Sequence, residues 1–385
     1  MKVVFAIDSF KGSISGREAA EAAALGVKDI YPDAECVICP VADGGEGTAA
    51  AMIEGAGGEY RYSTVADPLG RPVRAAWGIL PSGAAVIEMS AASGITLVSE
   101  EERDVMASDT YGVGEIILAA LDAGVRSFVI GIGGSATNDG GVGMLRALGF
   151  GFFDKRGVEI KRGAGGLADL ARIDLSGADP RLKECSVTVA SDVKNPLTGE
   201  RGATRIYGPQ KGVTGELIPK LDAYLAAYAR LTRELIPEAD ADMPGAGAAG
   251  GLGFALSAYL GAEMRSGADL VFEITGLESK LCDADLVITG EGRMDAQSAM
   301  GKLPQRVADL AKRHGKTVIA LAGSVADGAE ALSASGIDAV FSVLRSPMSL
   351  AEAMDRSNAM ANMRAAARQV FGLINAIKGK NNAIK

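Results

Sequence analysis

The stretch SFVIGIGGSATNDGGVGMLRALGFG, residues 127–151, joins an apolar run, a glycine-rich turn and an amphipathic segment. The apolar run at residues 128–130 predicts a short buried strand. Apolar residues at helical spacing from Val142 onward predict a helix that ends near Gly149. A strand, a glycine loop and a helix N-terminus in this order expose backbone N–H groups to an anion.

The polar residues of this loop have two interpretations. Ser135, Thr137, Asn138 and Asp139 are more polar groups than a tight turn needs, which favours binding of hydroxyls, phosphate or a metal. The alternative is a plain strand-to-helix connection in which Asn138 or Asp139 caps the helix. We favour binding, with Asp139 as a candidate metal ligand. The expected nucleotide- or phosphate-binding residues are Gly133, Gly134, Ser135, Thr137 and Asn138.

Other predicted strands run into similar polar loops. The strand at residues 2–7 leads to Asp8, Ser9 and Lys11, and the next strand leads to Asp43. A helix follows each loop, and the first helix opens with a Ser15–Glu18 capping box. Parallel α/β sheets bind ligands at the carboxyl ends of their strands, so these side chains are expected at a binding edge.

The chain length and the changing rhythm of its elements predict two domains. A chain of 385 residues exceeds one typical core. The strand–helix rhythm occupies both ends, whereas residues 73–80 and 84–89 alternate like a hairpin. We expect an α/β fold with a doubly wound, Rossmann- or flavodoxin-like parallel-sheet domain built from both ends, residues 1–71 plus 283–385. A second α/β domain, residues 72–282, is inserted, and the active site is expected in the cleft between them.

Composition excludes several classes of function. The net charge of −9 argues against a nucleic-acid partner. The apolar run before Asp8 is too short for a signal peptide or a membrane span, and few cysteines favour a reduced, cytoplasmic protein. The single histidine, His314, argues against a Ser-His-Asp triad or a histidine-rich zinc site. Proton transfer would therefore depend on Asp, Glu or Lys.

A second glycine-rich segment, GAGAAGGLG at residues 245–253, matches the spacing of a dinucleotide fingerprint. The fingerprint requires a strand immediately before it, and the preceding PEADADMP is not one. Two alternatives stay open: a phosphate-binding helix N-terminus, and close packing without a ligand. The residues concerned are Gly247, Gly250 and Gly251.

Several glycine-rich loops of this chain carry aspartate, glutamate, lysine or arginine, which suits phosphoryl transfer assisted by Mg²⁺. The sequence contains neither the P-loop pattern GxxxxGK[ST] nor the HRD and DFG signatures of protein kinases. Carboxylates after predicted strands are candidate metal ligands or bases, and basic residues there are candidate anion clamps. The acids are Asp43, Asp139, Asp192, Glu291 and Asp295. The cations are Lys11, Lys194, Lys211 and Arg293.

Seven motifs, in order along the whole chain, resemble the bacterial glycerate kinase family that lacks a P-loop. They are DSFKGS (8–13), ADGGEGT (42–48), IGGSATNDGGVGMLRALG (132–149), SDVKNPLTG (191–199), YGPQKG (207–212), GAGAAGGLG (245–253) and TGEGRMDAQSAMGK (289–302). The resemblance implies ATP-dependent phosphorylation of D-glycerate, usually to 2-phosphoglycerate. It also implies two α/β domains with the active site between them.

We assign roles on this basis. Asp192 is the preferred catalytic carboxylate and Asp43 the second choice, with Lys11 also catalytic. The expected substrate-binding residues are Asp8, Ser9, Lys11, Lys211 and Arg293. The expected metal ligands are Asp139, Glu291 and Asp295, with Mg²⁺ and ATP as cofactors. The alternatives are a kinase of another small hydroxy acid and a non-catalytic sugar-acid sensor, and the sequence leaves open whether the chain forms a homodimer.

Overall fold

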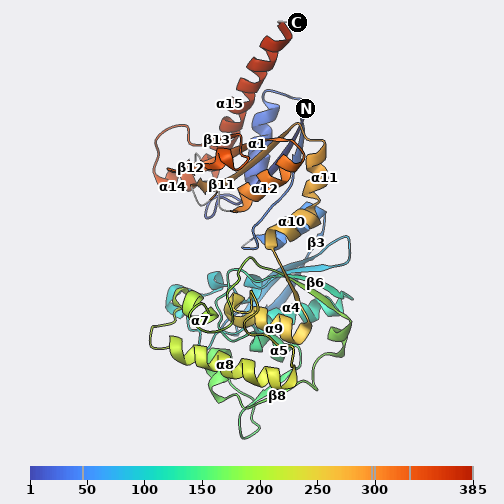
Figure 1. Ribbon diagram of the computed structural model, residues 1–385, viewed down its shortest axis with the longest axis vertical. Helices are drawn as coiled ribbons and strands as arrows, with labels where there is room; N and C mark the ends of the chain where they lie inside the picture. Colours follow the sequence, from blue (N-terminus) through green and yellow to red (C-terminus); the bar gives the residue numbers. More distant parts are fainter. Residues whose placement is uncertain (46, 296–297, 299–300, 329–330, 384–385) are drawn as a thin grey trace. The chain divides into compact units, whose positions relative to one another are not determined.

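The computed structural model describes residues 1–383 apart from 46, 296–297, 299–300 and 329–330. Glu46 of the ADGGEGT motif and four residues of the TGEGRMDAQSAMGK motif therefore lie outside the described residues. The chain forms two compact units (Figure 1), one from Met1–Asp43 with Val271–Lys385 and the other from Gly44–Leu270. The expected α/β class, with a parallel sheet built from both chain ends, is confirmed.

The first unit contains a five-stranded sheet in the order β13-β12-β11-β1-β2, and all its pairs are parallel. The two N-terminal strands thus pair beside three strands from the other end of the chain. The bounds are β1 (Lys2–Ile7), β2 (Glu35–Ile38), β11 (Leu286–Met294), β12 (Thr317–Val325) and β13 (Ala339–Ser342).

Helices cover both faces of this sheet. The alanine-rich α1 packs against α15, and together with Val3, Phe5 and Ile7 of β1 they form one buried core. Because side chains alternate along a strand, the remaining β1 residues face α12 on the other side. The helices are α1 (Gly16–Lys28), α11 (Leu277–Cys282), α12 (Leu303–Arg313), α13 (Ala331–Ala334), α14 (Leu350–Met354) and α15 (Arg356–Ala383).

Sequence patterns predict α1, α12 and a helix in the region of α14 and α15, but they do not predict α11 or α13. The Ser15–Glu18 capping box opens α1 as expected, because each residue accepts a hydrogen bond from the other's backbone. The sequence pattern predicts a single helix over residues 350–373, but the structure has α14 followed by α15. Asp355 interrupts it, because its Oδ1 accepts the backbone N–H groups of Ser357 and Asn358, both at 3.0 Å.

The second unit contains a six-stranded sheet in the order β10-β9-β6-β5-β4-β3. The pairs from β5 to β10 are parallel, whereas β3, β4 and β5 form an antiparallel meander. The strands are β3 (Glu59–Ala66), β4 (Pro72–Ile79), β5 (Ala85–Glu88), β6 (Ser127–Gly131), β9 (Ser186–Ala190) and β10 (Glu263–Arg265), with a separate pair β7 (Gly151–Phe153) and β8 (Arg172–Asp174).

The limits of the units differ from the expected residues 71 and 283. β3 belongs to the second unit because it pairs with β4 along its whole length. The sequence pattern does not predict this strand. The segment after residue 271 belongs to the first unit. The boundary at residues 270–271 lies within α10 (Gly267–Thr275), so no loop marks it in the sequence.

Helices of the second unit surround this sheet and its core. The sequence pattern predicts helices at residues 110–123 and 216–235, and the structure has α4 and α8 in these regions. Among residues whose placement is described, no helix is long and apolar enough to cross a membrane. The helices are α2 (Thr48–Ala56), α3 (Ser90–Ser93), α4 (Tyr111–Asp122), α5 (Val142–Ala147), α6 (Gly163–Gly166), α7 (Ala203–Tyr207), α8 (Ile218–Leu235) and α9 (Leu252–Leu260).

Candidate active site

In the first unit, strand register brings two carboxylates to one edge of the sheet. Ile7, the last residue of β1, pairs with Gly290 of β11. The backbone N–H of Asp8 then donates to the Gly290 carbonyl at 2.9 Å. Since β1 and β11 are parallel, Asp8 and Glu291 come next in register. Asp8 follows the last residue of β1, at the carboxyl end where α/β sheets bind ligands, whereas β11 continues past Glu291 to Met294.

The turn after Asp8 is tightly folded. The Phe10 N–H donates to the Ile14 carbonyl at 2.9 Å, and the Ser13 N–H donates to the Phe10 carbonyl at 2.8 Å. Gly12 has φ +78°, a left-handed conformation that glycine adopts without strain. This geometry leaves the Lys11 side chain exposed.

A cavity of about 610 Å³ lies at this edge, within the first unit. The expected residues Asp8, Ser9, Lys11, Asp43, Glu291 and Arg293 all line it. Lys302 also lines it and was not among the expected site residues, although it closes the TGEGRMDAQSAMGK motif. The fold therefore brings together acids and cations that are far apart in the sequence.

The carboxylates of this cavity have raised pKa values. The pKa of Asp8 is raised to about 6, mainly by burial and also by the charges of Asp43 and Glu291, whereas the Ser9 N–H bond and the charge of Lys11 act in the opposite direction. Burial also raises the pKa of Glu291. One oxygen of Glu291, Oε1, is buried without a hydrogen-bond partner. The site thus carries negative charge that a bound cation would compensate.

The residues of this cavity fit a magnesium ion that is coordinated partly by the protein and partly by the phosphates of a bound substrate. Among the described residues, no group of three or more His, Cys, Asp or Glu is arranged to hold a metal alone. Mg²⁺ usually takes one or two carboxylates and completes its coordination with water and substrate phosphates. Glu291 and Asp8 suit that role. The expected ligand Asp295 lies 3.8 Å from Arg293 Nε and 3.7 Å from Lys302 Nζ, so cations already surround it.

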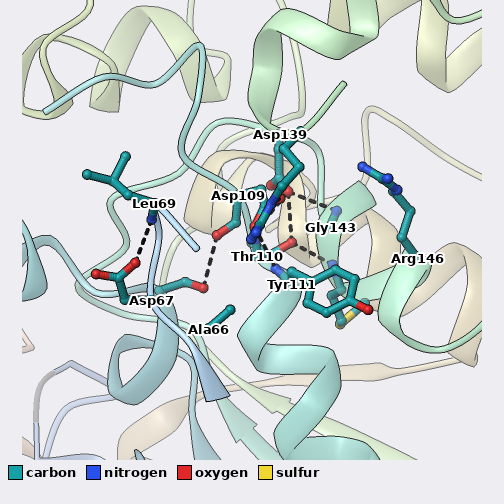
Figure 2. Close-up of polar contacts among 12 residues, drawn as sticks. Ala66, Asp67, Leu69, Asp109, Thr110, Tyr111, Asp139, Gly143 and Arg146 are labelled. Carbon is teal, nitrogen blue, oxygen red and sulfur yellow. Dashed lines mark hydrogen bonds and ion pairs between the residues drawn. The ribbon is translucent and has the colours of Figure 1, made fainter. Parts of the chain in front are cut away.

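In the second unit, Asp139 has a different role from the metal ligand we expected (Figure 2). Its Oδ2 accepts the Thr110 N–H at 3.0 Å, the Thr110 hydroxyl at 2.9 Å and the Gly143 N–H at 2.9 Å. Its Oδ1 accepts the Gly141 N–H at 3.1 Å. Asp139 is 1% exposed. These bonds occupy the carboxylate, which anchors the start of α5 to the start of α4.

A second buried carboxylate, that of Asp109, supports the same region, and the sequence pattern did not indicate it. Asp109 is buried, accepts the Tyr111 N–H at 3.0 Å and forms an ion pair with Arg162. It lies close enough to Asp139 to raise the pKa of Asp139, in addition to the larger effect of burial. The DTYG segment around Thr110 carries no glycine-loop signal, so only the fold shows that it supports the loop.

Lys211 is also internal. Its side chain is buried, and its Nζ donates to Ser135 Oγ and to the Thr137 carbonyl, both at 2.7 Å. Burial lowers the pKa of Lys211 to about 7, although the nearby Asp139 opposes this shift. The glycine loop thus engages the ammonium group of Lys211, and the expected contact of Lys211 with substrate stays a prediction. Lys211 fixes the conformation of the glycine loop.

The remaining loop residues differ in accessibility. Gly134 is exposed and Gly133 is half-buried, whereas Thr137 and Asn138 are buried. Asn138 Nδ2 donates to Thr204 Oγ1 at 3.0 Å, but Asn138 Oδ1 and Thr137 Oγ1 are buried without a partner. Their expected role in ligand binding stays a prediction.

The glycines of residues 245–253 are packing residues. A Cβ on Gly250 would overlap the Thr137 carbonyl, and one on Gly247 would overlap the Pro196 carbonyl. A Cβ on Gly251 would come within 2.8 Å of Gly140. All three glycines are buried. The structure shows close packing of this segment against the glycine loop, and phosphate binding by these glycines stays a prediction.

Asp192 lies where its sequence pattern predicts. It follows β9 and is exposed, and a Cβ on Gly44 would lie 3.5 Å from its Oδ2. Gly44 and Gly45 in turn pack closely against Gly133, since a Cβ on Gly133 would lie 3.1 Å from Gly45 Cα and 3.2 Å from the Gly44 carbonyl oxygen. Asp192 and Gly133 therefore both lie close to Gly44, and the catalytic role of Asp192 stays a prediction.

Residues 3–375 match the sequence pattern of the glycerate kinase family. The chain belongs to this family. It is 51% identical over 354 residues to a glycerate 2-kinase of Escherichia coli strain K12, covering 92% of this chain and 93% of that protein. It is 47% identical over 358 residues to a glycerate kinase of Bacillus subtilis strain 168, covering 93% and 94%. This family membership makes the chain a kinase, as expected.

A solved structure has the same fold. The crystal structure of a protein described as glycerate kinase 2, from Salmonella typhimurium LT2, superimposes with a TM-score of 0.88 at 47% identity. The match covers 98% of this chain and 99% of that one.

Proposed function

We propose that this kinase transfers the terminal phosphoryl group of ATP to D-glycerate, giving 2-phosphoglycerate and ADP in the cytoplasm. Membership of the glycerate kinase family supports the acceptor. The relative from Escherichia coli is named a glycerate 2-kinase, which supports position 2. Transfer to position 3 is the alternative product.

The observation that carries this proposal is the charged cavity of the first unit. Phosphoryl transfer needs cations around the phosphate oxygens and carboxylates that hold a divalent ion, and it depends mainly on positioning. Lys11, Arg293 and Lys302 supply the cations, while Asp8 and Glu291 supply the carboxylates. Bound Mg²⁺ would neutralise charge on the transferring phosphates.

The acceptor hydroxyl needs a proton acceptor, and Asp192 is our candidate. It is exposed at the carboxyl end of β9 close to Gly44, which in turn packs against Gly133 of the glycine loop. Asp43 is the second candidate, because it lines the charged cavity. The single histidine, at residue 314, has its Nε2 at 3.0 Å from Glu278 Oε1.

A coupled assay of ADP release tests the proposal. We expect turnover with D-glycerate, ATP and Mg²⁺, loss of turnover in excess chelator, and 2-phosphoglycerate identified by phosphorus NMR. Faster turnover of another hydroxy acid would favour a different acceptor. Binding of D-glycerate without any ADP release would favour the sugar-acid sensor.

A further inference from the structure

The cavity of the first unit is larger and more apolar than glycerate requires. Its volume of about 610 Å³ is typical of sites for ligands much larger than a three-carbon acid. Besides the charged cluster, its wall includes Ile14, Leu303, Val343, Leu344 and Met354. Glycerate carries a carboxylate and two hydroxyls but no apolar group, so it gains nothing from this part of the wall.

Polar atoms in the same wall lack good partners. Ser13 Oγ is buried without a hydrogen bond, as is Glu291 Oε1. Asn362 is 2% exposed. Its Oδ1 accepts the Arg345 Nε–H at 3.0 Å, whereas its Nδ2 donates to the Met348 thioether at 3.7 Å, which is a weak acceptor. Buried polar groups are normally satisfied, so these atoms indicate a ligand that offers hydrogen bonds.

The helix α14 contributes an apolar rim to the cavity. Leu350, Ala353 and Met354 of this short helix line it, and the Leu350 side chain is 75% exposed. A capping box from Ser349 to Glu352 opens the helix. Exposed leucine beside buried, unpartnered polar atoms suits a flat ligand with both apolar faces and polar edges.

We propose that this cavity is the nucleotide site, with the purine base and ribose against the apolar wall and the phosphates at the charged cluster. The inference rests on the proposed function, since it takes a nucleoside triphosphate as the donor. Such a ligand joins a flat base to a polyanion, which matches both parts of the wall. Ser13 and Asn362 provide hydrogen bonds to the base or ribose. The glycine loop after β6, where we expected the nucleotide, is then not the base site.

Equilibrium binding of two probes tests this assignment. MgATP carries a base, whereas magnesium tripolyphosphate carries only the phosphates. In Ala353→Phe the new ring fills the apolar part of the cavity. The matched control is Ala365→Phe, because Ala365 is a half-buried alanine of the same unit that lines a neighbouring hollow instead.

We expect Ala353→Phe to weaken MgATP binding at least about tenfold and to change tripolyphosphate binding less than about twofold. Ala365→Phe should bind both probes like the wild type. Leu350→Ser is a second test that the exposed position tolerates, and it should weaken MgATP about threefold. Melting temperatures of all variants check that they are folded.

Three results would overturn the assignment: ATP no tighter than tripolyphosphate in the wild type, equal loss of both probes in Ala353→Phe, or unchanged ATP binding in Ala353→Phe and Leu350→Ser. Turnover of D-glycerate is measured in the same preparations. ATP binding without turnover contradicts the proposed function but supports this site, whereas turnover with unchanged ATP binding in both variants contradicts the site alone.

Discussion

The loop after β6 and the loop after β1 both place an aspartate beyond the carboxyl end of a parallel strand, but the two aspartates have different surroundings. Asp139, after β6, accepts four hydrogen bonds and is almost completely buried. Asp8, after β1, accepts the Ser9 N–H at 2.7 Å and lines an open cavity. The number of hydrogen bonds that the carboxylate accepts within the fold, rather than its position in the sequence, distinguishes a structural aspartate from one that can bind a ligand.

The comparison also has an energetic side. A buried carboxylate is stable only when donors replace the water it has lost. Thr110, Gly141 and Gly143 supply those donors to Asp139. Burial raises the pKa of both aspartates, but Asp139 has four hydrogen bonds that oppose this effect, whereas Asp8 has the Ser9 N–H and the charge of Lys11. Asp8 is therefore kept at a cost in stability, which is typical of functional residues.

The largest expected effect is on activity. Asp8→Asn should lower kcat by about 10²–10⁴-fold, because an amide neither holds a divalent cation nor accepts a proton as a carboxylate does. The melting temperature at neutral pH should stay equal or rise. The folded pKa of about 6 lies above the unfolded value of 3.8, so burial of the ionised form destabilises the fold as pH rises through that window.

The pH dependence of kcat/KM tests whether the ionised form of Asp8 is required. If the ionised form of Asp8 is required, kcat/KM should fall as pH drops below about 6, where Asp8 becomes protonated in the free enzyme. Asp8→Asn should lack this acidic limb. Normal kcat in the variant, or an unchanged acidic limb, would place Asp8 among the structural residues with Asp139.

Asp192→Asn tests the proposed base in the second unit. We expect a loss in kcat of about 10²–10⁴-fold with an unchanged melting temperature, because the exposed side chain follows β9 without a buried role. Asp169→Asn, another exposed aspartate of this unit, is the control. A variant with near-normal kcat would transfer the assignment to Asp43.

Asp139→Ala should act on stability instead. Removing the carboxylate leaves the buried N–H groups of Thr110 and Gly143 without acceptors, which we expect to cost about 3–5 kcal/mol in unfolding free energy. Denaturant unfolding measures this loss, and Asp169→Ala should stay within about 0.5 kcal/mol of the wild type. Unchanged stability with lost metal-dependent activity would restore Asp139 as a metal ligand.

The smallest expected effect concerns Lys211. Lys211→Met removes the bonds to Ser135 and Thr137, which should cost about 1–3 kcal/mol. The folded pKa of about 7 lies below the unfolded value of 10.5, so the unfolded chain binds more protons between these values. The stability of the wild type relative to the variant should therefore rise from pH 7 to 10. A pH-independent difference would contradict the buried titrating lysine.

The sequence by itself determined the α/β class, the family and most of the elements. Apolar strands, the Ser15–Glu18 box and the strand-end loops depend on neighbours along the chain, so local patterns predict them. It also predicted that Asp8, Lys11 and Glu291 belong to one site. The sequence did not predict the strand β3 or the helix break at Asp355. Pairing with β4 forms the strand, and the hydrogen bond that Asp355 accepts from the start of the next helix forms the break.

Only the tertiary structure decided what each polar residue does. Asp139, Lys211 and Gly250 look like binding residues in the sequence, but contacts from Thr110, Ser135 and Thr137 make them internal supports. Asn362 and Lys302 join the cavity through α15 and the start of α12. Burial and hydrogen-bond partners come from segments distant in the chain, and these set whether a charged group is compensated within the fold or left for a ligand.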